Sequence, residues 1–382
     1  MGAIRLFLAS VVVLSHAQAF VIGPAGHAVS AYLLVGMNGG RAVVCFFVIS
    51  GFLISYSLSR KYVSLSRKYV GPGALSKFYF ARFLRIFPLY WAAIALLVAF
   101  DAFGARHQLA QQVSSGDITH LLSGFFLFGA DWRVEFTHYP APDWLALPSG
   151  LAIAWTLSVE LTFYAVAPFV LTSLARSVAL FTMSCLVRGL LVTLYGFDPI
   201  LTYMFIPTTI CCFLLGHLAR LLYDHYLHSA ELYNLLFGIS ALIVLQFATQ
   251  PLDDPYFYGF IILFALFIPY CFAKTKDIRI LNFCGDLSYP VYLCHPFVFF
   301  LVYALNRWQP LSEESALDRF LDARLPTPIV GTASALIALA AVLVVAATLH
   351  LAIEVPLQLA VRRRQSFFGR SREALAPAAA HP

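Results

Sequence analysis

Ten apolar segments, separated by polar loops, constrain this chain more than any other feature. Each has about the length that a helix needs to cross a bilayer, roughly 20 residues. Inside a bilayer only helices and closed barrels satisfy every backbone N–H and C=O group. We therefore predict an all-α fold, a polytopic integral membrane bundle of about ten transmembrane helices. The segments span residues 4–22, 40–58, 79–100, 149–174, 177–195, 200–222, 232–249, 256–273, 287–306 and 329–357.

The composition agrees with a membrane bundle, because the chain is 60% hydrophobic and only 12% charged. Soluble domains are about 25% charged. We expect residues 1–360 to form one membrane domain, in contact with the lipid bilayer, and residues 361–382 to form a basic cytoplasmic tail without fixed structure. The net charge of +6 does not indicate nucleic-acid binding, since the basic residues lie between the apolar segments. The seven cysteines show no metal-ligand spacing, so we expect no metal site.

Basic residues in the loops orient the segments, because cytoplasmic loops are enriched in Lys and Arg. The loop after the second segment contains Arg60, Lys61, Arg67 and Lys68, in a tandem repeat of SLSRKYV. If this loop is cytoplasmic, ten spans place both termini and the basic tail in the cytoplasm. The short apolar stretch 118–130 must then not cross, because an extra span would move the later basic loops outside.

The first segment contains two ionisable side chains, Arg5 and His16, which are 11 residues apart. On a helix this spacing is about three turns plus 20°, so both point to one face, about 16 Å apart along the axis. A polar stripe on such a helix faces protein or a water-filled cavity. An imidazole there suits a general base in acyl transfer. We predict that His16 is the chemical centre and that Arg5 holds an anionic substrate; the alternative for His16 is helix packing.

Glu160 is the second candidate catalytic residue, and it also falls near the middle of a predicted span. A buried carboxylate needs a partner, and His16 or an arginine is the natural one. In such a pair the carboxylate would orient the imidazole and stabilise its protonated form. The alternatives are a structural ion pair or a neutral, protonated glutamic acid.

Arg82 and Arg85 lie at the cytoplasmic end of the third predicted helix. Their i, i+3 spacing places them on one face. Two guanidinium groups on one face suit the binding of phosphate groups. The alternative is the ordinary enrichment of basic residues on the cytoplasmic side.

Other polar and aromatic residues within the spans are candidates for contact with substrate. Ser50 stands next to a glycine, a pair that favours close helix packing, with lining of an acyl channel as the alternative. His295 is a second imidazole candidate. The remaining candidates for the substrate channel are Trp155, Tyr289 and Tyr292.

Together these motifs resemble the membrane acyltransferase-3 family, which contains sugar and antibiotic O-acyltransferases such as O-antigen and exopolysaccharide acetylases. The matches follow the family's order and begin with Arg5 and His16, with ten residues between them. They continue with AVVCFFVISGFLIS at 42–55, RFLRIFPLYW at 82–91, WTLSVELTFY at 155–164 and LSYPVYLCHPF at 287–297.

The resemblance implies a function as well as a bundle of about ten helices. It implies an O-acyltransferase in the bacterial inner (cytoplasmic) membrane. The donor substrate is acyl-CoA, most often acetyl-CoA, with no permanently bound cofactor. The acceptor is a hydroxyl of a cell-surface or exported glycan or glycolipid. The family's essential His and Arg fall on His16 and Arg5, its basic pair on Arg82 and Arg85 beside the CoA phosphates, and its Glu on Glu160.

The chain departs from the family in the second segment. Many members have Gly-Val-Asp before FFVISG, whereas this chain has Ala42, Val43 and Val44. No carboxylate from that helix can assist His16, which makes Glu160 the stronger candidate for the role.

A transporter or flippase of an amphiphilic substrate is the rival prediction, because buried charges around a central path also suit transport. Against it, the sequence shows no inverted repeat and no matched pair of broken helices. The acceptor, the acyl chain length, the oligomeric state, and the choice between direct transfer and an acyl-His intermediate stay open.

Overall fold

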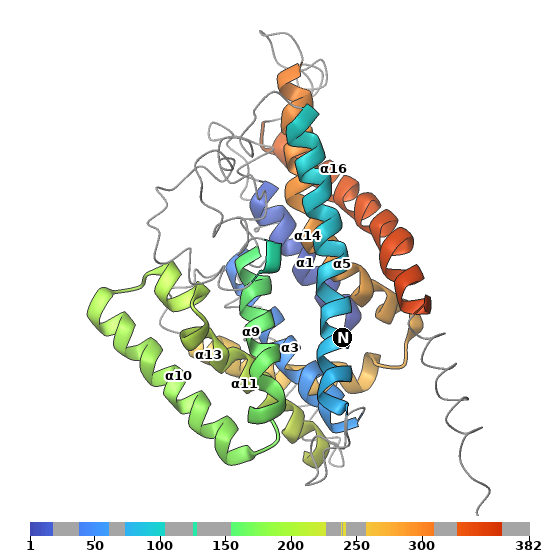
Figure 1. Cartoon of the computed structure of the whole chain (residues 1–382). Coiled ribbons are helices and arrows are strands. Elements are labelled where there is room, and N and C mark those ends of the chain that lie inside the picture. Colours follow the sequence, from blue (N-terminus) through green and yellow to red (C-terminus); the bar gives the residue numbers. More distant parts are fainter. Residues whose placement is uncertain are drawn as a thin grey trace, which may run out of the picture.

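The structure, a computed structural model, describes residues 1–17, 38–60, 73–103, 125–127, 154–226, 238, 240–241, 257–308 and 327–360. Within these ranges all regular elements are helical, which confirms the predicted all-α class (Figure 1). The α-helices are α1 (Gly2–Ala17), α3 (Gly39–Arg60), α5 (Ala74–Phe103), α9 (Ala154–Val170), α10 (Leu174–Tyr195), α11 (Ile206–Tyr226), α13 (Phe257–Thr275), α14 (Arg279–Trp308) and α16 (Thr327–Leu349). Two π-helical turns, η2 (Ile200–Met204) and η3 (His350–Glu354), complete the set.

Six helical stretches of this described part are long and apolar enough to cross a membrane, by length and composition. They are Gly39–Ser59, Ala74–Leu96, Leu174–Tyr195, Ile200–Asp224, Phe257–Thr275 and Ala335–Ala360. Two shorter apolar helices cover Gly2–Ala17 and Trp155–Val170. The tail 361–382 and most of segments 232–249 and 118–130 lie outside the described residues. The count of about ten and the cytoplasmic termini therefore stay predictions.

Helices α1, α3 and α14 form the centre of the bundle, with α1 packed against both of the others. Helix α3 packs along α11, and α16 packs against α14. Figure 1 shows α10 at the periphery, where it lies beside α11. This arrangement brings the first helix of the chain next to the motif LSYPVYLCHPF on α14, although almost 280 residues separate them.

Small residues let α1 approach its neighbours closely, as expected for helices packed in a membrane. Ala9 and Ala17 on α1 and Ala335 and Ala338 on α16 belong to one buried cluster, which also contains Val291 of α14. At the other end of α1, a Cβ added to Gly2 would lie 1.5 Å from the Leu281 carbonyl oxygen of α14. Close contact at both ends fixes the height of Arg5 and His16 relative to α14.

Glycines also bring α3 and α11 into backbone contact. A Cβ added to Gly51 would lie 1.9 Å from the Phe213 carbonyl oxygen, and one added to Gly216 would lie 1.9 Å from the Val48 carbonyl oxygen. Ser55 Oγ and His217 Nδ1 form a 2.7 Å hydrogen bond further along the same pair of helices. These contacts fix the position of α3, and they confirm the predicted packing role of the glycine beside Ser50.

We expect the substitution Gly216→Ala to destabilise the protein, because the added methyl group forces α3 and α11 apart. Overpacking of this kind costs about 1–3 kcal/mol. The control is Gly189→Ala on the exposed side of α10, where an added Cβ meets nothing within 4 Å. The measurement is the thermal midpoint of each purified variant in detergent. Equal midpoints for the two variants would contradict the close packing of α3 on α11.

Candidate active site

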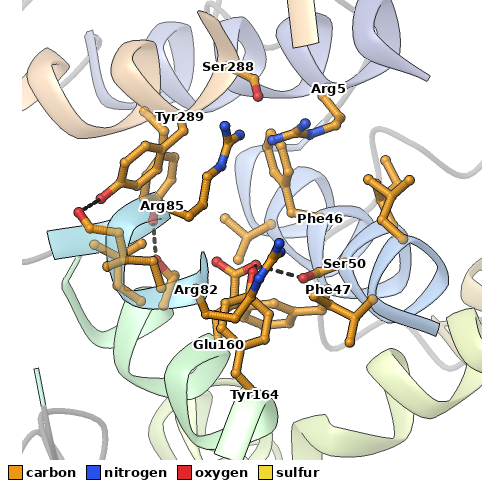
Figure 2. A pocket seen from close by; sticks show the side chains of 18 of the residues that line it. Arg5, Phe46, Phe47, Ser50, Arg82, Arg85, Glu160, Tyr164, Ser288 and Tyr289 are labelled. Atoms are coloured by element: carbon orange, nitrogen blue, oxygen red, sulfur yellow. Dashed lines mark hydrogen bonds between the residues drawn. The ribbon is translucent and has the colours of Figure 1, made fainter. Parts of the chain in front are cut away.

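A cavity of about 290 Å³ lies between α1, α3, α5, α9 and α14 (Figure 2). Its apolar wall comes mainly from one face of α3, including Phe46, Phe47 and Leu53. Its polar wall collects residues from all five helices. These are Arg5, Ser50, Arg82, Arg85, Thr156, Glu160, Tyr164, Asp286, Ser288, Tyr289 and Tyr292.

The three predicted arginines converge on this cavity. Arg5 reaches it from α1, while Arg82 and Arg85 reach it from the same side of α5, as their spacing predicted. Figure 2 shows their guanidinium groups directed toward a common space. The structure therefore brings Arg5 together with two arginines that lie 77 and 80 positions further along the chain.

Aromatic rings support two of these guanidinium groups. The Arg82 group lies 5.6 Å from the centre of the Tyr164 ring, and the Arg85 group lies 5.8 Å from the centre of the Tyr289 ring. A cation over a ring face is stabilised without using its N–H donors. Arg82 Nε is buried and has no hydrogen-bond partner among the described residues. The arginines thus keep donors available for an anionic ligand.

The Glu160 carboxylate is bound differently from the expected pairing with His16. Its Oε1 atom accepts hydrogen bonds from Ser50 Oγ at 2.6 Å and from the Tyr164 hydroxyl at 2.5 Å. Tyr164 lies one turn along the same helix, and Ser50 comes from α3, which packs on α9. Figure 2 shows Glu160 beside Arg82. Of the two partners expected for Glu160, an arginine lies beside it, whereas His16 contacts His295 of α14, so the pairing of Glu160 with His16 is not present in this structure.

His16 and His295 form a close pair between α1 and α14. Their Nδ1 and Nε2 atoms are 2.9 Å apart, and the rings lie 17° from parallel with centroids 5.1 Å apart. Arg5 also faces α14, since its Nη1 lies 3.7 Å from a Cβ added to Gly285. The prediction that Arg5 and His16 share one helix face is confirmed.

Tyr292 connects the histidine pair to the cavity. Its side chain lines the cavity and its hydroxyl is 2.9 Å from Thr156 Oγ1. Its backbone carbonyl oxygen lies 2.6 Å from Nδ1 of His295. Phe46, which also lines the cavity, meets the Tyr292 ring edge to face at 6.4 Å. His16 thus lies behind this wall, outside the set of cavity-lining residues.

The other predicted contact residues divide into two groups. Ser50, Tyr289 and Tyr292 line the cavity, which for Ser50 is the alternative to the packing role, and their contact with substrate stays a prediction. Trp155 is buried in the core against Phe47 and Tyr203 and is not among the residues that line this cavity, so its contact with substrate stays a prediction. A large aromatic ring at the start of α9 fills space between helices instead.

Asp286 is the acidic cavity residue that our sequence reasoning missed. It stands one residue before the motif LSYPVYLCHPF, in the first turns of α14. Asp286 lies just outside the predicted span 287–306, so the search for charged residues within spans did not include it.

Arg188 and the His350–Glu354 pair are buried, are not among the cavity-lining residues and have local partners. Arg188 of α10 donates to the Thr202 carbonyl oxygen, and its guanidinium group lies 4.3 Å from the centre of the Phe257 ring. His350 and Glu354 pair with each other at 2.6 Å. Among the residues whose placement is described, no group of three or more His, Cys, Asp and Glu side chains could hold a metal ion.

Comparison with known proteins agrees with this arrangement. A family model described as "Acyltransferase domain", Acyl_transf_3, matches residues 1–351. The chain belongs to the acyltransferase-3 family. This membership confirms the resemblance expected from the motifs and the expected class of acyltransferase. It also supports the multi-pass membrane architecture.

This acyltransferase-3 protein is also similar to "Nodulation protein 10" of Rhizobium leguminosarum bv. viciae, with 32% identity over 185 residues. The matched part covers 44% of this chain and 42% of that relative, so it spans less than half of either protein. No solved structure matches the chain.

Proposed function

We propose that this acyltransferase-3 protein moves an acyl group from acyl-CoA to a hydroxyl of a cell-surface or exported glycan or glycolipid. The acyl group in this proposal is acetyl, the protein resides in a bacterial inner membrane, and His16 is the general base. The observation that carries the proposal is the convergence of Arg5, Arg82 and Arg85 on one cavity whose wall, at Tyr292, contacts the His16–His295 pair.

The arginine cluster suits the phosphates of CoA. Guanidinium groups bind phosphate oxygens in a bidentate manner and stay charged at any physiological pH. Arg82 and Arg85 lie toward the end of α5 that we predict to be cytoplasmic, which is where acyl-CoA is available. The apolar α3 side of the cavity, around Phe46 and Leu53, suits the pantetheine arm.

In the proposed transfer step His16 acts as the general base, which requires the Phe46 and Tyr292 side chains between it and the cavity to move. The acceptor hydroxyl gives its proton to the imidazole while its oxygen attacks the thioester carbonyl carbon. The C–S bond then breaks, and the imidazolium returns the proton to the departing sulfur, so that the products are the ester and free CoA. An acyl-His intermediate is the covalent variant of this proposal, in which the imidazole nitrogen attacks the thioester first.

Transport of an amphiphilic substrate is the second candidate function, because three arginines and two carboxylates surround a cavity in a membrane bundle. The two functions differ in their need for a donor. A counterflow assay in proteoliposomes without acyl-CoA separates them: substrate exchange in that assay favours transport, and its absence together with CoA release favours acyl transfer.

The proposal predicts that His16→Ala abolishes acyl transfer. Loss of a general base costs about 100-fold to 10,000-fold in rate. The measurement is the release of free CoA from acetyl-CoA by purified protein in detergent, with envelope glycan added. Ser10→Ala, on the same helix, is the matched control, because Ser10 Oγ bonds only its own helix at the Leu6 carbonyl. Wild-type turnover by folded His16→Ala protein would contradict the role of His16.

A second prediction concerns donor binding by Arg82 and Arg85. Replacing either by Ala should raise KM for acetyl-CoA by about tenfold, roughly 1.4 kcal/mol, because phosphate contacts are lost. The variants should differ little from wild type with acetyl-pantetheine, which has no phosphate on its arm. Arg176→Ala on exposed α10 is the control and should leave both KM values unchanged. An equal rise in KM for both donors would show that these arginines do not bind the phosphates.

A further inference from the structure

The chemistry of the bonded groups determines which nitrogen atoms of His295 and His16 donate a hydrogen bond and which accept one. The Tyr292 carbonyl oxygen can only accept, so Nδ1 of His295, 2.6 Å away, must carry the hydrogen. A neutral imidazole has one N–H group, and Nε2 of His295 is therefore an acceptor. His16 Nδ1, 2.9 Å from that atom, must then donate. Because neutral His16 also has one N–H group, at Nδ1, its other ring nitrogen, Nε2, carries the lone pair that can accept a proton.

Pro296 explains why the Tyr292 carbonyl takes part in this chain of hydrogen bonds. In an α-helix the carbonyl of residue i accepts from the N–H of residue i+4. The residue four positions after Tyr292 is Pro296, which lies inside α14 and has no N–H group. The side chain of His295 supplies the hydrogen bond that Pro296 cannot. The adjacent pair His295–Pro296 thereby fixes the orientation of the His295 ring.

We infer that His295 is a positioning residue, which together with Pro296 holds His16 in the tautomer whose Nε2 can accept a proton. The inference rests on the proposed function of His16 as base. Its geometric support is independent of the cavity, since His295 is only 1% exposed and contacts His16 directly. Glu160 does not take this role, because its hydrogen bonds go to Ser50 and Tyr164.

The arrangement also accounts for the protonated form of the base. When His16 Nε2 takes the proton of the substrate hydroxyl, the positively charged His16 ring still donates a hydrogen bond from Nδ1 to neutral His295. The Tyr292 carbonyl polarises His295 from the far side, which strengthens its Nε2 as an acceptor. The proton never leaves His16 along this chain, so His295 orients and stabilises the base without exchanging protons with substrate.

The test compares three substitutions, two at His295 and one at Pro296. His295→Gln keeps an acceptor, since the amide oxygen can take the place of Nε2, whereas His295→Leu removes it. We expect His295→Leu to lower kcat by about 100-fold or more, with KM for acetyl-CoA changed less than about threefold, because donor binding is untouched. His295→Gln should retain kcat within about tenfold of wild type. Pro296→Ala returns a backbone N–H to the Tyr292 carbonyl and should also lower kcat.

Cys294→Ala is the matched control, because Cys294 is buried at the position before His295 on α14 but faces Val342 of α16. It should keep wild-type kcat and show that substitution in this turn is tolerated. Wild-type kcat in His295→Leu would overturn the inference. An equal loss of kcat in His295→Gln and His295→Leu, with both variants as folded as the control, would overturn it too.

Nitrogen-15 NMR of histidine-labelled protein tests the tautomer without any turnover. The inference expects His16 protonated at Nδ1 in the wild type and a mixture of tautomers in His295→Leu. A wild-type His16 protonated at Nε2 overturns the inference. Failure of the proposed function is a separate result, seen as wild-type CoA release in His16→Ala, and it does not change these spectra.

Discussion

Compensation of charge inside a membrane bundle is the constraint on which the rest of this structure depends. A charged side chain costs several kcal/mol in the bilayer interior unless it faces partners or water. Here three arginines share the cavity with two acidic residues, Glu160 and Asp286. The cluster keeps one guanidinium in excess (3 − 2 = 1). Under the proposed function, an anionic ligand completes this balance.

Close helix packing makes such a cluster possible. The arginines come from two helices and the acids from two others, so their distances depend on how those helices are placed. Gly2 sets the contact of α1 with α14, and Gly51 and Gly216 set that of α3 with α11. Each contact is between backbones, which leaves little freedom for the helices to slide. The site is therefore held by rigid elements, as precise chemistry requires.

The sequence allowed prediction of the helical class, of the shared face of Arg5 and His16, and of the Arg82–Arg85 pair. The first depends on the length of the apolar segments, and the other two on periodicity within one helix. The sequence did not allow prediction of partners across helices, where the Glu160–His16 pair, one of the two expected for Glu160, is not present. Which residues meet depends on the height and rotation of each helix, and these follow from backbone contacts at glycines that one sequence does not reveal.

The role of His295 shows what local chemistry adds once the helices are placed. A histidine followed by proline in a helix is visible in the sequence, and the missing N–H at Pro296 is certain. Its consequence is not visible, because the Tyr292 carbonyl could have been satisfied in other ways. Only the placement of α1 beside α14 shows that the ring bonded to this carbonyl also meets His16.

The central claim is that the arginine cavity holds the donor so that its acyl group reaches His16. The most direct measurement is an experimental structure of the protein with a stable thioether analogue of acetyl-CoA. The account predicts phosphate oxygens in contact with Arg82 and Arg85, and the acyl carbonyl beside Nε2 of His16 after movement of the Phe46 and Tyr292 side chains. An analogue bound with its phosphates away from these arginines, or with its acyl group far from His16, would contradict it.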